Sequence, residues 1–298
     1  TVPTEDPATV QAAAPFQIGD VLTTSFGHMV HDVYSNFLPP LLPVFIANLS
    51  LSKTEAGVLT LFLQAPWLLQ PLIGHFADRF NLHFLFILAP TVTGAMMSLL
   101  GIAPSYAMLA LLLTVAGISG ASLHAVGSAM AGNLSGRRLG QGMSLWMVGG
   151  ELGFALGPIM LASTIKFFSL KGMPWLSIIG LMGSAVLFVR LRDAPAPPPR
   201  ADRGLPWQQA LRDMRPVMLP LMGLITGRAF TMAALSTYLP TFLSEEGVDL
   251  WLASVSLSVW QIAGAIGILL GGSLSDRLGR RLVLLISVLT TPLSMFTF

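Results

Sequence analysis

The sequence predicts an all-α membrane protein built from two similar helical blocks. The chain is 53% hydrophobic and 10% charged, whereas soluble domains carry about a quarter charged residues. Its apolar runs are long enough to cross a hydrocarbon core of about 30 Å. Because backbone groups in lipid must be satisfied within the segment, and the runs are too long and evenly apolar for barrel strands, we expect helices.

Nine apolar runs are predicted to span the membrane, six before a polar linker and three after it. They lie at about 19–47, 53–76, 83–101, 104–131, 142–165, 174–192, 216–243, 249–274 and 282–298. The first run contains Pro39, Pro40 and Pro43. We expect one long kinked helix there, since neighbouring helices can re-satisfy the carbonyls that proline frees.

The polar segments divide the chain into domains. Residues 1–17 lack the basic start and apolar core of a signal peptide, so we expect a disordered cytoplasmic tail. Residues 18–192 are predicted to form an N-terminal six-helix bundle. Residues 193–215 contain the Pro-rich run DAPAPPPRADRG and are typical of a semi-rigid cytoplasmic linker. Residues 216–298 are predicted to be the first three helices of a C-terminal bundle.

Basic residues predict the orientation. With the N-terminus in the cytoplasm, the inner loops hold twelve arginines and the outer loops hold three lysines. This asymmetry is typical of a multi-pass protein of the inner (plasma) membrane. The net charge of +2 reflects the same asymmetry and gives no reason to propose a nucleic-acid partner. The chain has no cysteine, so disulfide and thiolate chemistry are excluded.

A short motif occurs twice, 198 residues apart when Asp78 is aligned with Asp276. The second copy is GGSLSDRLGRR, at 271–281, and the first is IGHFADRFN, at 73–81. The pairs Leu42-Pro43 and Leu239-Pro240 match at nearly the same offset. Tandem blocks of this length joined by a polar linker are typical of secondary transporters.

The pattern GxxxDRxGRR resembles the signature loop of the major facilitator superfamily, which lies between the second and third helices and again between the eighth and ninth. The resemblance implies a role in conformational gating for Gly74, Asp78, Arg79, Gly272, Asp276, Arg277, Gly279, Arg280 and Arg281. The first copy has Asn81 where glycine is usual, and asparagine tolerates the left-handed conformation that the turn needs. The superfamily has twelve helices, so a chain that stops at Phe298 is expected to be a fragment or to lack the last three.

Two further segments resemble the fosmidomycin-resistance branch of this superfamily. The first is GHMVHDVYSNFLPPLLP, at 27–43. The second lies within 117–159 and consists of a Gly- and Ala-rich fourth span with a buried histidine, followed by the pattern GGxxGxxLGP in the fifth span. That branch usually has proline where this chain has Ala125. Small residues recur on one face of the fifth span, at Gly149, Gly153, Gly157 and Pro158. They favour close helix packing, and they also resemble the antiporter motif of exporters, which is thought to seal the two halves.

Ionisable residues within the spans are candidates for function, because each costs at least about 2.5 kcal/mol on insertion. We predict that Asp32, Glu151, His28 and His124 carry protons. For Glu151 and His124, a hydrogen-bonded packing role remains an alternative. His28 lies one turn before Asp32, whereas His31 is turned about 100° away.

Arg228 falls inside the seventh span, at the repeat counterpart of about residue 30. It is therefore expected to face His31 and Asp32 across a central cavity. There it would either recognise substrate, together with His31, or form a buried ion pair with Asp32 that fixes the two halves in register. The remaining candidates for substrate contact are aromatic and amide residues, any of which could instead face lipid: Tyr34, Gln64, Trp67, Trp146, Phe230, Tyr238, Trp260 and Gln261.

The sequence contains no zinc-ligand spacing, nucleotide-binding glycine loop or nucleophile–base–acid set, so we predict no metal, no cofactor and no enzymatic activity. The predicted function is proton-coupled efflux of a small drug-like or anionic molecule by alternating access. We expect a monomer whose partners are its substrate, protons and the lipid bilayer. Two alternatives stay open: an uptake symporter or facilitator for a small organic anion, and a non-transporting membrane scaffold.

Overall fold

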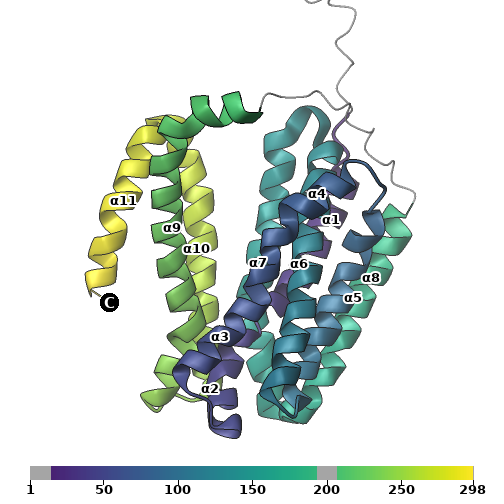
Figure 1. Cartoon of the computed structure of the whole chain (residues 1–298), viewed down its shortest axis with the longest axis vertical. Helices are drawn as coiled ribbons and strands as arrows, with labels where there is room; N and C mark the ends of the chain where they lie inside the picture. Colours follow the sequence, from purple (N-terminus) through teal and green to yellow (C-terminus); the bar gives the residue numbers. More distant parts are fainter. Residues whose placement is uncertain (1–14, 193–206, 298) are drawn as a thin grey trace, which may run out of the picture.

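The computed structural model describes residues 15–192 and 207–297, and Figure 1 shows them as a set of roughly parallel helices. Thus residues 1–14 of the predicted tail and 193–206 of the predicted linker lie outside the described residues. The elements are α1 (Ile18–Ser35), α2 (Leu38–Leu49), α3 (Lys53–Gln64), η2 (Ala65–Leu69), α4 (Gln70–Ala77), α5 (His83–Leu99), η3 (Leu100–Ile102), α6 (Tyr106–Ser135), η4 (Gly136–Arg138), α7 (Leu139–Phe168), η5 (Leu170–Leu176), α8 (Ser177–Leu191), α9 (Trp207–Glu245), α10 (Leu250–Leu278) and α11 (Arg280–Thr297). Helix α9 begins earlier than the predicted start at 216.

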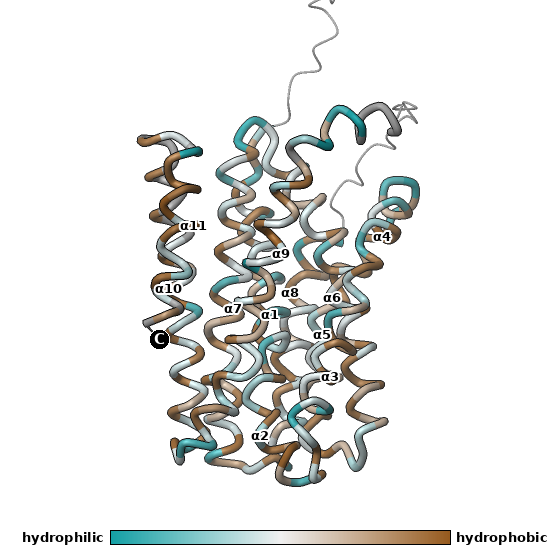
Figure 2. The backbone as a smooth tube through the Cα atoms, turned by 60° about the vertical axis from the view of Figure 1, so that its left-hand side comes forward, coloured by the Kyte–Doolittle hydropathy of each residue, from teal (hydrophilic) through white to brown (hydrophobic). Residues whose placement is uncertain are grey.

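Six helical stretches of the described residues are long and apolar enough to cross a membrane. One of them, Tyr106–Phe168, contains both α6 and α7, so the six stretches account for seven of the nine predicted spans. The ninth predicted span corresponds to Arg281–Ser294, which is apolar but shorter. The first predicted span corresponds to α1 and α2, and its residues His28, His31 and Asp32 lower its hydropathy. Figure 2 shows hydrophobic residues along most of the helix lengths and hydrophilic segments gathered towards the ends.

The predicted single kinked helix at 19–47 is wrong in detail, because the chain breaks between Ser35 and Leu38. Pro39 and Pro40 occupy the first turn of α2, where their missing N–H groups leave no hydrogen bond unmade. The Asn36 side chain donates a hydrogen bond to the Phe154 carbonyl oxygen at 2.8 Å and holds the break against α7. Two helices therefore replace the single helix, and only Pro43 remains inside α2.

Helices α1 and α7 pack closely along the face that the small-residue pattern predicted. A side chain added at Gly149, Gly153 or Gly157 would meet backbone carbonyl oxygens of α1, those of Ser25, Met29 and Val33 respectively. The packing hypothesis for this face is thus confirmed. Whether the same face also acts as an antiporter seal stays a prediction.

Two apolar cores stabilise the N-terminal bundle. One includes Val33, Leu41 and Leu113, and the other includes Val21, Phe86 and Leu187. Among the described residues, both cores and the apolar side chains packed against them lie between Phe16 and Leu191. The apolar side chains of α9 and α11, by contrast, are largely exposed.

The C-terminal helices meet the N-terminal bundle at one end, the lower end in Figure 1. Lys53 of α3 pairs with Glu245 of α9 at 2.9 Å. The Tyr238 hydroxyl donates to the Lys53 carbonyl oxygen, and the Trp251 indole N–H donates to the Ser163 hydroxyl at 3.1 Å. We call this set, with Gly57 against the Tyr238 hydroxyl, the inter-bundle contact.

The two signature motifs form different turns. Gly279 has φ of +86°, which confirms the predicted tight turn between α10 and α11. Asn81 was expected to take the left-handed conformation and does not, since the positive-φ non-glycine residues of the described chain are Ser50 and Ser169. Its side-chain oxygen instead accepts a hydrogen bond from the His83 backbone N–H. The side chains of Gly272, Asp276, Arg277 and Arg280 lie outside those described.

Candidate functional site

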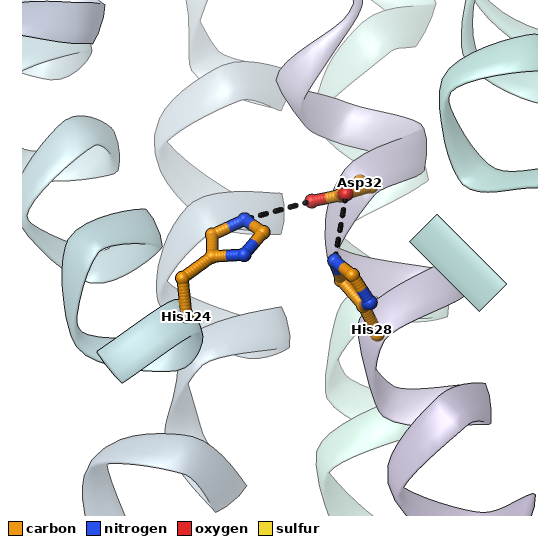
Figure 3. A group of neighbouring side chains, drawn as sticks. All are labelled: His28, Asp32 and His124. Atoms are coloured by element: carbon orange, nitrogen blue, oxygen red, sulfur yellow. Dashed lines mark ion pairs between the residues drawn. The ribbon is translucent and has the colours of Figure 1, made fainter. Parts of the chain in front are cut away.

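A buried polar cluster lies between the two apolar cores, where α1 faces α6 (Figure 3). The Asp32 carboxylate is 1% exposed and is surrounded by imidazoles. Its Oδ2 lies 3.0 Å from His28 Nε2. Its Oδ1 accepts a hydrogen bond from His31 Nδ1–H at 2.8 Å and lies 3.6 Å from His124 Nε2. We call His28, His31, Asp32 and His124 the histidine–aspartate cluster.

The local structure explains how these side chains meet. His28 and Asp32 are four residues apart in α1, so they share one face of the helix. His124 extends from the middle of α6, on which Gly120 leaves room for the His31 ring. The close approach of α7 seals the opposite side, since a Cβ added at Gly150 would lie 2.7 Å from His28 Nε2.

The expectation that His31 points away from Asp32 is wrong. Adjacent residues do differ by about 100° around a helix, yet the carboxylate has two oxygens and reaches His28 with one and His31 with the other. The ion pair between Asp32 and Arg228, which was one of two alternatives for Arg228, is not formed in this structure either. Within the described part of the chain, the ion pairs of Asp32 are those with His28, His31 and His124.

Two tryptophans enclose the cluster. Trp146 of α7 is 2% exposed, its ring stacks on His28 with centroids 4.0 Å apart, and its carbonyl oxygen accepts a hydrogen bond from His28 Nδ1–H at 2.8 Å. Trp67 of η2 lies 4.8 Å from the His124 ring. Trp146 was predicted to touch substrate, whereas in this structure it orients His28.

Glu151 and Arg228 are more accessible than the histidine–aspartate cluster. Glu151 is half-buried on α7, and Arg228 is exposed on α9. The Glu151 carboxylate interacts electrostatically with Asp32, Arg228 and His28. Arg228 thus lies near a carboxylate of the other bundle, but that carboxylate belongs to Glu151 rather than Asp32.

The other predicted substrate residues occupy separate regions. Tyr34 is fully buried and its hydroxyl donates to the Leu176 carbonyl oxygen at 2.7 Å, so it fixes helix packing instead of lining a cavity. Phe230 is 78% exposed, and Tyr238 belongs to the inter-bundle contact. Gln64 is exposed, whereas Trp260 and Gln261 are partly buried on α10.

Comparison with known proteins agrees with this arrangement of helices. The sequence profile of the Major Facilitator Superfamily matches residues 24–298. The chain belongs to the major facilitator superfamily. It is therefore a multi-pass membrane protein of a transporter family, not of an enzyme family.

Several members of the superfamily resemble the chain over most of its length. The Fosmidomycin resistance protein of Escherichia coli (strain K12) is 27% identical over 289 residues, which cover 95% of this chain and 70% of that protein. A Probable nitrate/nitrite transporter, NarK2, of Mycobacterium tuberculosis (strain ATCC 25618 / H37Rv) is 29% identical over 271 residues, which cover 88% of this chain and 67% of that protein.

A solved structure of the same fold is that of a bacterial homologue of the human lysosomal transporter Spinster, in an inward-facing and unoccupied conformation. It superposes with a TM-score of 0.70 at 19% identity and covers 90% of this chain. The chain spans 64% of the length of that structure. The likeness establishes the superfamily fold of the described helices.

Sequence reasoning found each member of the cluster separately but missed their convergence. It predicted no metal site, because the spacing from residue 28 to residue 124 matches no ligand motif. The structure nevertheless brings one ligand atom each of His28, Asp32 and His124 within 4.8 Å of one another. The available signal was the superfamily fold, which makes the first and fourth spans neighbours.

Proposed function

We propose that the protein exports a small drug-like or anionic molecule in exchange for protons, by rocking of its two helical bundles. The observation that supports this proposal is Glu151, a half-buried carboxylate on a spanning helix, which lies within electrostatic range of Arg228 of the other bundle. An intramembrane carboxylate is costly and marks an ion or proton path. The resemblance to the Fosmidomycin resistance protein supports the direction of transport.

Glu151 is a better candidate for proton exchange than Asp32. A coupling group must reach water from each side in turn, and Glu151 is half-buried, whereas Asp32 is 1% exposed and held by three imidazoles. In the proposed cycle, Arg228 approaches Glu151 in one orientation and favours its ionised form. When the bundles rock, a proton neutralises Glu151 and Arg228 becomes available for an anionic group of the substrate.

The replacement Glu151→Gln is expected to remove proton coupling while preserving the shape of the side chain. In proteoliposomes loaded with fosmidomycin as the first probe, an imposed proton gradient should no longer accelerate its movement, and the rate should fall to the value measured without a gradient. Substrate–substrate exchange should persist. The matched control is Glu246→Gln, which changes an exposed glutamate outside the spans. Gradient-driven transport at the normal rate in the Glu151→Gln variant would refute the assignment.

A second candidate function is uptake of a small inorganic or organic anion. It is favoured by the resemblance to a Probable nitrate/nitrite transporter and by the exposed guanidinium of Arg228. Counterflow of nitrate and of fosmidomycin in right-side-out and inverted vesicles separates export from uptake. A non-transporting scaffold would show neither flux and would tolerate Glu151→Gln.

We also propose that the N-terminus and the loop around η4 face the cytoplasm, as the distribution of arginine and lysine predicts. The chain has no cysteine, so a single introduced thiol reports its own side. An impermeant thiol reagent added to intact cells should label Glu246→Cys and leave Gln141→Cys unlabelled, since both positions are exposed. The reverse pattern would show that the orientation is inverted.

A further inference from the structure

We propose that His28, Asp32 and His124 bind a divalent transition-metal ion inside the N-terminal bundle, with Zn²⁺ as the expected occupant. Two imidazoles and a carboxylate are ligands that such ions accept. The proposal does not depend on the direction or coupling of transport. It rests on hydrogen-bond roles and on distances within the histidine–aspartate cluster.

The hydrogen bonds of His28 leave two acceptors facing each other. His28 Nδ1 lies 2.8 Å from the Trp146 carbonyl oxygen, which only accepts, so Nδ1 carries the proton. In the neutral ring, Nε2 then carries no proton and presents a lone pair. It lies 3.0 Å from the carboxylate oxygen Oδ2 of Asp32. Two lone pairs at this distance repel unless a cation lies between them.

The other imidazoles add to this deficit. The Nε2 atoms of His28, His31 and His124 are all buried and make no hydrogen bond within the described part of the chain. A metal ion would accept the lone pairs of His28 and His124 together with the carboxylate. It would thereby satisfy polar atoms whose burial is otherwise costly.

The distances suit zinc. Ligand atoms about 2.0–2.1 Å from Zn²⁺ at tetrahedral angles lie about 3.3 Å apart. The observed separations are 3.0 Å, from His28 Nε2 to Asp32 Oδ2, and 3.6 Å, from His124 Nε2 to Asp32 Oδ1, on either side of that value. The three ligand atoms as a set lie within 4.8 Å of one another, so an ion would draw the two imidazoles slightly closer together. Figure 3 shows both imidazoles directed at the carboxylate.

The surroundings have the features of a metal site. Metal-binding histidines usually donate their second N–H to a carbonyl oxygen, and ligating carboxylates are themselves hydrogen-bonded. His28 donates to the Trp146 carbonyl oxygen, and Asp32 accepts from His31.

The topology keeps the ion within the N-terminal bundle. The ligands come from α1 and α6, which belong to the same bundle, so rocking against the C-terminal helices leaves their geometry unchanged. We therefore infer that the ion crosslinks α1 to α6, and that it enters past His124, whose side chain is 18% exposed.

The test uses the full chain purified in detergent, stripped with a chelator and titrated with Co²⁺, whose visible absorption reports tetrahedral coordination, and then with Zn²⁺. We expect one ion per chain and a rise in the melting temperature on addition of Zn²⁺. His124→Ala should weaken Zn²⁺ binding by more than about 100-fold, since loss of an outer-shell partner alone costs 10–100-fold. The matched controls are His75→Ala and His83→Ala, the two histidines outside the cluster.

A second variant keeps the test informative if His124→Ala folds poorly. His124→Cys should retain tetrahedral Co²⁺ and add a thiolate-to-cobalt absorption band, because the new ligand binds the ion directly. The proposal is overturned if Co²⁺ and Zn²⁺ bind without defined stoichiometry, or if His124→Ala binds Zn²⁺ as tightly as the control variants do. It is equally overturned if neither ion binds. In that case a second proton on His28 occupies the position between His28 Nε2 and Asp32 Oδ2.

Discussion

Replacement of Gly153 by leucine is expected to destabilise the N-terminal bundle strongly. The first carbon of the new side chain would meet the Met29 carbonyl oxygen and would lie 2.9 Å from both Asp32 Cβ and the Val33 backbone nitrogen. Backbone atoms cannot rotate away, so α1 must separate from α7. Overpacking costs about 1–3 kcal/mol and occasionally more, and this position belongs at the upper end. A loss of about 3 kcal/mol lowers the ratio of folded to unfolded protein by roughly 100-fold.

The measurement is the yield of monodisperse protein on size-exclusion chromatography, with thermal melting of what remains. The matched control is Gly140→Leu on the same helix, where an added Cβ meets nothing within 4 Å. It should express and melt like the unsubstituted protein. If both variants behave alike, helix α7 does not approach α1 as closely as described.

Crosslinking across the inter-bundle contact is expected to stop transport completely. Gly57 of α3 and Tyr238 of α9 touch across the two bundles, and rocking must separate them. The chain has no cysteine, so a Gly57→Cys/Tyr238→Cys pair offers the two thiols that a short, reducible bifunctional reagent can join. Fluxes in proteoliposomes should fall to the protein-free level after crosslinking and recover after reduction.

Each single-cysteine variant, treated with the same reagent, serves as the control and should transport throughout. Full activity of the crosslinked double variant would mean that this end of the molecule stays closed during transport. The alternating-access proposal would then need a different moving contact.

The fold was largely predictable because it depends on features that a sequence displays directly. Apolar length predicts the spans, and the spacing of Gly149, Gly153 and Gly157 predicts which face of α7 approaches a neighbour. The break between α1 and α2 was harder, because prolines predict a distortion but not its form. Its form depends on the Asn36 side chain finding the Phe154 carbonyl oxygen in another helix, a partner that local sequence does not reveal.

The candidate site was predictable only as separate residues. The free-energy cost of inserting ionisable side chains into the membrane identifies Asp32, Glu151 and the histidines as candidates. Whether these side chains contact one another depends on how the helices pack and how far each side chain extends. Asp32 was assigned to Arg228 by repeat symmetry and instead contacts imidazoles of its own bundle. The role of Tyr34 was equally hard to predict, since its hydroxyl could line a cavity or donate a hydrogen bond to a carbonyl oxygen. In the structure the Leu176 carbonyl oxygen lies close enough to accept that hydrogen bond.

The restriction of both apolar cores to residues 16–191 has a consequence for biosynthesis. The partners that bury Val33, Phe86 and Leu187 are all synthesised before α9 begins. At roughly 5–20 residues per second, synthesis of 193–245 takes roughly 3–10 s. During that interval the first eight helices can assemble beside the translocon, so that α9 meets a finished surface as it enters the bilayer.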